Sequence, residues 1–322
     1  MRSIVRFAAV LALAVTAVPV AAQIPAGKTI HFIIPFPPGG TTDFIGRSFA
    51  DQLSRVLGQP VVVENKGGAG GSIGAEAIAR AAPDGLTIGM ATVSTHAVNP
   101  ACNPNIGYDP VRDFAPITQL AASPHVILVN PAFPASNYAE FVKLLKAEPG
   151  KYSFATSGTC GTGHMLGESF KAAASVSIVH VPYRGAGPAL NDVLANHVPI
   201  MIDGLSSSMP QIVAGKLRPI VIASPARVPT LPDVPTFGDV GLSSINDPSW
   251  YGLVAPAGTS RATLVALHAA AVKALHDPAL IERYRAAGAD AGGNSSADYA
   301  AEIRGSYEHM KTLVATQNIH PE

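Results

Sequence analysis

Strand-like and helix-like segments alternate along almost the whole chain, and this alternation constrains the fold more than any other sequence feature. The first β-branched run, Thr29–Pro35, is followed by apolar residues at helical spacing from Ile45 to Val56, and Gly58 ends that helix. Alternation of this kind is typical of βαβ units and predicts mainly parallel sheets. Further strands are predicted at 61–64, 86–93, 126–129, 152–155, 178–181, 200–202, 217–223 and 250–255, and further helices at 72–82, 136–147, 162–174, 186–196, 207–214, 260–276, 278–287 and 296–317.

The chain crosses between two such α/β sets at two places. It leaves the first set near 120–124, and it passes 244–256 before entering a helical tail with only one strand before it. Because one strand is too little for a third sheet, we expect the tail to return to the first set. Two α/β lobes crossed twice by the chain are typical of a hinged ligand clamp. The predicted organisation is a discontinuous first lobe of 23–124 and 247–322, and a second lobe of 125–246.

The first 22 residues have the layout of a secretory signal. Arg2 and Arg6 precede an uncharged apolar run at 7–18, and small residues follow at 19–22. A membrane-spanning helix needs about 20 apolar residues, and this run is shorter. We therefore expect export to the periplasm, with residues 1–22 removed by cleavage before Gln23.

The charge balance and the scattered histidines exclude several classes of function. Lys+Arg and Asp+Glu number 22 each, so no basic stripe is available for a nucleic acid. The ten His residues are dispersed and no H-E-x-x-H motif occurs, which disfavours a zinc site. The sequence predicts no nucleic-acid partner, no metal and no cofactor.

Two cysteines, Cys102 and Cys160, lie in loops rich in turn-forming residues. In an oxidising compartment an even number permits one disulfide, which would stabilise the fold by roughly 4 kcal/mol in the chain-entropy model. The alternative is a pair of buried thiols. We expect the bridge.

Two glycine-containing motifs bear on catalysis. Gly70–Gly74 matches the G-x-S-x-G nucleophile elbow, but a loop rather than a strand precedes Ser72, which is better explained as a helix N-cap. Gly161–Gly167 resembles a dinucleotide loop, which alone is weak support. No Ser/His/Asp order is evident, so an enzyme is not expected. A hydrolase that uses Ser72 or Ser157 remains the alternative from a different class.

Three loops rich in Gly, Ser and Thr run into predicted helix N-termini, at 36–43, 67–72 and 156–164. Free N–H groups and the positive end of the helix dipole attract anions. Ligands of open α/β sheets bind beyond the carboxyl ends of the strands. The three loops together favour capture of an anion over catalysis.

Eight motifs in order make the chain closely resemble the solute-binding receptors of tripartite tricarboxylate transporters, called Bug-type receptors. The resemblance implies a two-lobed type II periplasmic-binding-protein fold that closes on a small di- or tricarboxylate, an acidic amino acid or an aromatic acid. It also implies a monomer that delivers its ligand to the permease subunits of a tripartite transporter. A receptor that serves as a ligand sensor is the alternative. The motifs are Phe32–Asp43, Leu57–Asn65, Gly67–Gly74, Pro83–Gly85, Tyr108–Pro110, His180–Tyr183, Leu231–Thr236 and Ala255–Thr259.

The resemblance also implies a set of ligand-binding residues from both lobes. Asp43 either fixes its own loop or accepts a donor from the ligand. Arg184 stands where the family often carries Lys or another residue, and it could hold a second carboxylate. Cys102 and Cys160 depart from the family's ordinary loop residues. The implied set is Pro38, Gly39, Gly40, Thr41, Thr42, Asp43, Ser94 and Thr95 from the first lobe, and Thr156, Ser157, Gly158, His164, Tyr183, Arg184 and Asp203 from the second.

Overall fold

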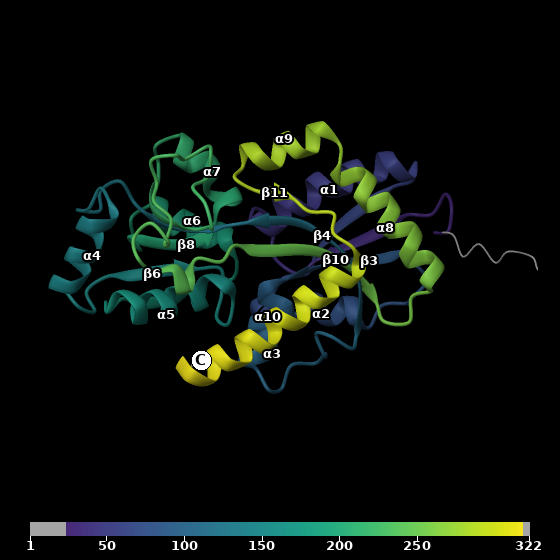
Figure 1. Ribbon diagram of the computed structural model, residues 1–322, viewed down its shortest axis with the longest axis horizontal. Helices are drawn as coiled ribbons and strands as arrows, with labels where there is room; N and C mark the ends of the chain where they lie inside the picture. Colours follow the sequence, from purple (N-terminus) through teal and green to yellow (C-terminus); the bar gives the residue numbers. More distant parts are fainter. Residues whose placement is uncertain (1–23, 318–322) are drawn as a thin grey trace, which may run out of the picture.

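The computed structural model describes residues 24–317, which form two α/β lobes side by side along the long axis of the molecule (Figure 1). Each lobe is built on its own sheet, and helices cover both faces of each sheet. The predicted α/β two-lobed fold is thus confirmed. The predicted signal at 1–22 lies outside the described residues.

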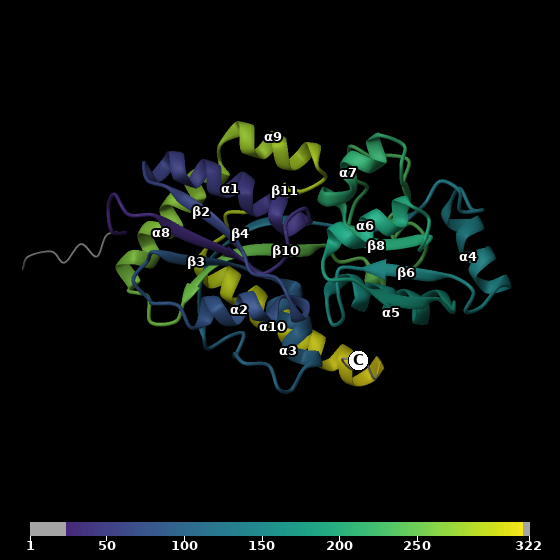
Figure 2. The same ribbon diagram turned by 180° about the vertical axis from the view of Figure 1, so that it is seen from behind.

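The first lobe contains a six-stranded sheet in the order β11-β4-β10-β3-β1-β2. Buried residues of α1, α8 and α9 pack on one face, and those of α2, α3 and α10 on the other (Figures 1 and 2). The strands are β1 (Ile30–Ile34), β2 (Val61–Asn65), β3 (Thr87–Thr92), β4 (Phe114–Ser123), β10 (Ser249–Pro256) and β11 (Asp290–Ala291). The helices are α1 (Thr41–Leu57), α2 (Ser72–Ala79), α3 (Asn99–Cys102), α8 (Arg261–Leu275), α9 (Pro278–Ala286) and α10 (Ser296–Gln317).

The second lobe contains a five-stranded sheet in the order β7-β6-β8-β5-β9. Phe141 and Phe170 bring α4 and α5 onto one face, and Val193 and Met209 bring α6 and α7 onto the other. The strands are β5 (His125–Val129), β6 (Ser153–Thr156), β7 (Val179–Pro182), β8 (Ile200–Gly204) and β9 (Arg218–Ala223). The helices are α4 (Tyr138–Ala147), α5 (Thr162–Ala174), α6 (Ala186–Leu194) and α7 (Leu205–Val213).

Both sheets are mixed, so the expectation of mainly parallel sheets is wrong. β10 is antiparallel to β3 and β4, and β5 is antiparallel to β8 and β9. Among the strands described above, β1 pairs in parallel with β2 and β3, and β6 with β7 and β8. The physical reason is the double crossing between lobes. β4 carries the chain out of the first lobe and β10 carries it back, so two neighbouring strands run in opposite directions.

Two segments between the third and fifth strands were not predicted as elements. β4 contains Pro116 and small residues, so it lacks a clear alternating pattern, and its pairing with β10 is irregular on either side of Leu253. After β3 the chain forms a π-helix at Ser94–Val98 that continues into α3. Within residues 24–317 no single helix has the length and apolar composition to cross a membrane. Among these residues, one bent pair of helices, α8 with α9, has that length and composition when the two are taken together.

Candidate functional site

The loop between β1 and α1 presents the start of a helix toward the second lobe. Its N-cap is Gly40, which has no side chain to cap the first turn. Asp43 accepts hydrogen bonds from the Gly39 N–H (3.1 Å), the Arg47 Nε (2.8 Å) and the Asn65 Nδ2 (2.9 Å). These contacts match the loop-fixing role considered for Asp43. The start of α1 has no side-chain cap, and Gly40, Thr41 and Thr42 line the space between the lobes.

A small cavity of about 40 Å³, here called the inner cavity, lies between the lobes. Both lobes and the crossing strands line it, with hydroxyl groups prominent in the lining. The residues that line it are Phe36, Pro37, Gly40, Thr41, Thr42, Thr92, Ser94, His125, Ser157, Thr162, Ala186, Asp203, Gly204, Ser249, Trp250 and Tyr251.

None of the residues that line the inner cavity is a lysine or an arginine. Its one carboxyl group belongs to Asp203, which is buried and accepts hydrogen bonds from the hydroxyls of Ser207 (2.7 Å) and Ser208 (3.1 Å). Burial raises the pKa of Asp203 from its ordinary value. Burial lowers the pKa of His125 to about 4, so this imidazole is neutral at neutral pH. An anion in this cavity would therefore depend on N–H and O–H donors rather than on a cation.

A larger cavity of about 770 Å³, here called the outer cavity, shares Phe36, Pro37 and Ser157 with the inner one. The glycine loop 67–71 lines it from the first lobe, and loops 157–159 and 182–185 line it from the second. Arg184 is the cationic side chain in this lining. Together the two cavities form a site with a polar inner end that has no lysine or arginine and an outer end that carries one cation.

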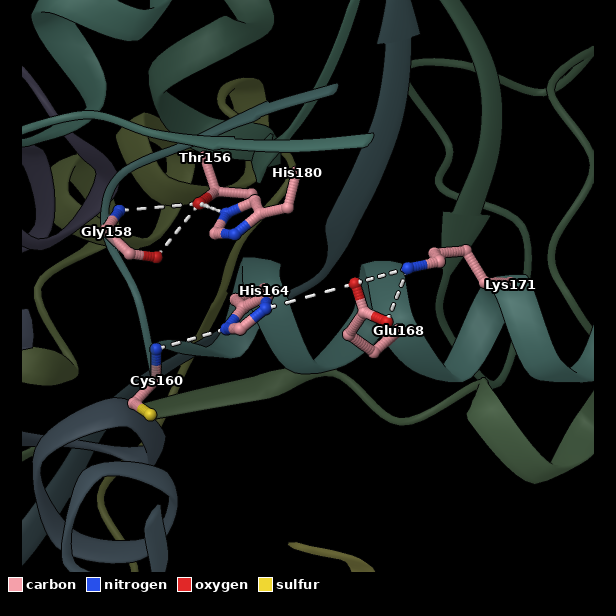
Figure 3. Close-up of polar contacts among 7 residues, drawn as sticks. All are labelled: Thr156, Gly158, Cys160, His164, Glu168, Lys171 and His180. Atoms are coloured by element: carbon pink, nitrogen blue, oxygen red, sulfur yellow. Dashed lines mark hydrogen bonds and ion pairs between the residues drawn. The ribbon is translucent and has the colours of Figure 1, made fainter. Parts of the chain in front are cut away.

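Behind the second-lobe loop, two imidazoles stack on each other (Figure 3). The rings of His164 and His180 lie 4.0 Å apart at an angle of 9°. The His164 Nδ1 accepts a hydrogen bond from the Cys160 N–H (3.2 Å), and the Thr156 hydroxyl shares a hydrogen bond with the His180 Nε2 (2.7 Å). Thr156 also donates to the Gly158 carbonyl (2.9 Å). His164 and Thr156 thus support the loop from behind and line neither cavity.

The structure distributes the implied ligand-binding residues over three positions. Asp43, Thr95 and His164 are buried in the protein interior. The Thr95 hydroxyl, for example, accepts a hydrogen bond from the Thr92 N–H (3.0 Å) and shares another with the His96 Nδ1 (3.0 Å). Gly40, Thr41, Thr42, Ser94, Ser157 and Asp203 line the inner cavity, Pro38, Ser157, Gly158, Tyr183 and Arg184 line the outer one, and Gly39, Asp43, Thr95, Thr156 and His164 line neither.

Sequence reasoning missed the residues that the crossing strands contribute. His125 starts β5, and Ser249, Trp250 and Tyr251 start β10, and all four line the inner cavity. The available signal was their position in or next to the two predicted crossings at 120–124 and 244–256.

The expected Cys102–Cys160 disulfide is wrong for this structure. Both cysteines are free and buried. Cys102 ends α3 and Cys160 lies just before α5, and the two loops meet because both cysteines pack in one buried cluster. Both side chains belong to an apolar cluster with Met165 and Trp250, an environment that suits reduced thiols.

Comparison with known proteins gives consistent matches over most of the chain. The family model described as "Tripartite tricarboxylate transporter family receptor" matches residues 45–319. Protein BugT of Bordetella pertussis is 35% identical over 280 residues, which are 87% of this chain and 86% of that protein.

Solved structures with the same fold are also similar in sequence. One described as "Structure of a periplasmic transporter" has a TM-score of 0.90 and 50% identity, and the match covers 92% of this chain and 99% of that one. Rpa4515 of R. palustris, solved with adipate, has a TM-score of 0.88 and 31% identity, with 91% and 98% covered.

Proposed function

The chain belongs to the family of tripartite tricarboxylate transporter receptors, and from this premise we propose that it captures a small organic carboxylate between its lobes and releases it to a tripartite permease. The observation that carries the proposal is the inner cavity, which lies between both lobes and faces the uncapped start of α1. That Rpa4515 was solved with adipate supports a carboxylate as the ligand.

The size of the inner cavity supports a single carboxylate group as its occupant. A water needs roughly 10–15 Å³ of such space, so about 40 Å³ holds about three waters, or the three heavy atoms of one carboxylate. The start of α1 supplies N–H donors and the positive end of the helix dipole. Thr41, Thr42 and Ser94 add hydroxyl groups at the same place. The rest of the ligand would then extend into the outer cavity.

Arg184 in the outer cavity favours a ligand with a second acidic end. Its planar guanidinium can hold a carboxylate through two parallel hydrogen bonds. We therefore propose a dicarboxylate or tricarboxylate, with one carboxylate in the inner cavity and another at Arg184.

The remaining parts of the proposal concern how the protein works in the cell. The proposed lobes are 23–124 with 247–322, and 125–246, joined at the strands that cross between the two sheets. The proposed location is the periplasm after cleavage before Gln23, supported by similarity to a protein described as a periplasmic transporter. The protein is proposed to act as a monomer. A neighbouring permease gene would favour transport, and a neighbouring kinase gene would favour sensing.

A thermal-shift screen of mono-, di- and tricarboxylates tests the proposed function. A ligand that binds only the folded state raises the melting temperature by mass action. We expect at least one dicarboxylate or tricarboxylate to do so, and a shift by another ligand class alone would reject the proposal.

An ester-hydrolysis assay addresses the enzymatic alternative. The Ser72 hydroxyl donates to the Ala69 carbonyl (2.7 Å), as a local turn contact does. Turnover that is lost in Ser72→Ala or Ser157→Ala would favour a hydrolase. We expect none.

A further inference from the structure

Three described helices of the second lobe, α5, α6 and α7, begin at a glycine that cannot cap them, and α5 and α7 find partners in the first lobe. The N-caps of α5 and α7 are Gly161 and Gly204, and neither helix has a side-chain cap of its own. By contrast, Asn137, Ser260 and Asp277 cap α4, α8 and α9 with their own side chains. The first N–H groups of α5 and α7 therefore need partners from elsewhere.

For α7 the partner is Thr41 of the first lobe. The Ser207 N–H, in the third position of α7, donates to the Thr41 Oγ1 at 3.1 Å, and the two hydroxyls lie 2.9 Å apart. The third N–H is one that an N-cap side chain normally satisfies. A Cβ atom on Gly204 would collide with Thr41 Oγ1. The Thr41 hydroxyl thus occupies the place that the side chain of an N-cap residue would take.

For α5 the partner is Ser94 of the first lobe. The Thr162 N–H donates to the Ser94 Oγ at 3.0 Å, and the Thr162 hydroxyl lies 2.8 Å from the same oxygen. A Cβ atom on Gly161 would lie 3.5 Å from Ser94 Oγ, in ordinary contact. Thr41 and Ser94 both line the inner cavity, so the two caps lie beside the proposed ligand site.

We propose that Thr41 is an N-cap in trans for α7 and that Ser94 satisfies the first N–H of α5 from the other lobe, so that both contacts stabilise these helices only when the lobes are closed and act as a closure latch. Opening the cleft would remove both caps, and water would replace them less well. An N-cap typically shifts an equilibrium by about five-fold, so each cap should favour the closed state by about that factor. The apparent affinity of a clamp depends on the fraction that is competent to bind, so the latch also sets affinity.

The latch rests on the proposed function only for its role in ligand capture, because its test needs no ligand. Three variants separate the effect of the capping hydroxyl from a general effect of substitution on folding. Thr41→Val removes the hydroxyl and keeps the side-chain shape, whereas Thr41→Ser keeps the hydroxyl. Gly204→Ser gives α7 a cap of its own at a backbone conformation (φ −66°, ψ 135°) that serine adopts readily, and it blocks the approach of Thr41.

Three measurements are made on each protein without ligand: small-angle X-ray scattering, exchange of the Ser207 amide hydrogen by NMR, and the melting temperature. We expect the wild type and Thr41→Ser to populate the compact form. Thr41→Val should lower the ratio of closed to open molecules by about five-fold, with a matching rise in Ser207 exchange. Gly204→Ser should open the lobes while Ser207 stays protected and the melting temperature is maintained.

Unchanged scattering in both Thr41→Val and Gly204→Ser would overturn the latch, and so would a wild type that is already fully open. Equal opening of Thr41→Ser and Thr41→Val would also overturn it, because the hydroxyl would not be the cause. If either Thr41 variant failed to fold, Ser94→Ala provides the same test at α5, with Thr162 as the reporting amide. Failure of the carboxylate screen would leave all of these readouts intact, so the two proposals fail separately.

Discussion

Arg184 and Asp203 offer opposite charges to a ligand that spans the two cavities. Arg184 lines the outer cavity, and Asp203 lines the inner one with its carboxyl bonded to Ser207 and Ser208. A ligand with two acidic ends therefore meets a favourable charge at one end and an unfavourable one at the other. The two residues can be tested separately because they lie at different ends of the site.

Arg184→Ala should weaken binding of a dicarboxylate much more than binding of its monocarboxylate analogue. The loss of a charge-assisted hydrogen bond costs about 1.5–3 kcal/mol, and the monocarboxylate has no group for Arg184 to hold. Calorimetric titration of the wild type and the variant with both analogues measures the difference. Equal weakening of both would place Arg184 outside ligand recognition.

Asp203→Asn should strengthen carboxylate binding at pH 7.5 and flatten its pH dependence. Burial raises the pKa of Asp203, so lowering the pH neutralises this carboxyl sooner than an exposed one and removes its repulsion of the ligand. We expect wild-type binding to tighten as the pH falls toward the raised pKa of Asp203, and the variant to bind about ten-fold more tightly than the wild type above that pKa, a difference of about 1.4 kcal/mol. Weaker binding by the variant would show that Asp203 accepts a hydrogen bond from the ligand.

At the scale of elements, β10 is held between its neighbours by a close contact with α10. Gly252 of β10 faces the ring of Tyr299, and a Cβ atom there would overlap that ring. Tyr299 is fully buried, packs edge-on against Trp250 (5.6 Å, 86°), and its hydroxyl has no hydrogen-bond partner among the described residues. This contact fixes the strand that returns the chain to the first lobe.

Tyr299→Phe should raise the free energy of unfolding by about 1 kcal/mol, because it removes a buried hydroxyl without a partner. Gly252→Ala, at the same contact, should lower it by about 1–3 kcal/mol, because the added methyl group overpacks the interface. Urea denaturation of both variants measures these changes. Destabilisation by Tyr299→Phe would mean that the hydroxyl has a partner after all.

Local patterns predicted most helices and strands, but not the assembly of the site. The run from Phe32 to Asp43 indicated a strand, a loop and a helix, and the structure has β1 and α1 there. The strand β4 was not predicted, because Pro116 interrupts its hydrophobic pattern. His125 and Tyr251 were not assigned to the site, because pairing with distant strands places them there: His125 pairs with Gly204 and Tyr251 with Ala121. The contacts of Thr41 and Ser94 with the helices of the other lobe also could not be predicted, since a glycine at a helix start does not indicate which hydroxyl approaches it.

At the scale of the whole molecule, buried histidines couple the fold to pH. Burial lowers the pKa of His96 to about 3 and that of His125 to about 4, whereas an unfolded histidine titrates near about 6.5. The unfolded state therefore binds more protons than the folded state between these values. The stability that the two neutral rings contribute is fully present above about pH 6.5 and is lost as the pH falls toward 4.

The free energy of unfolding should accordingly fall steeply between pH 6.5 and pH 4. His96→Gln should reduce that slope even if it lowers stability at every pH, because one titrating ring is gone. His276→Gln, at an exposed position, serves as the control for the loss of one histidine. Urea denaturation at several pH values measures the slope, and a slope that is the same in His96→Gln as in the wild type would contradict the assignment.

The most direct test of the account is a crystal structure of the protein with the dicarboxylate that stabilises it most. The account predicts one carboxylate in the inner cavity, within hydrogen-bond distance of the first N–H groups of α1 between Gly40 and Thr42, and the other carboxylate at Arg184. A ligand found away from the start of α1, or bound outside the space between the lobes, would contradict it.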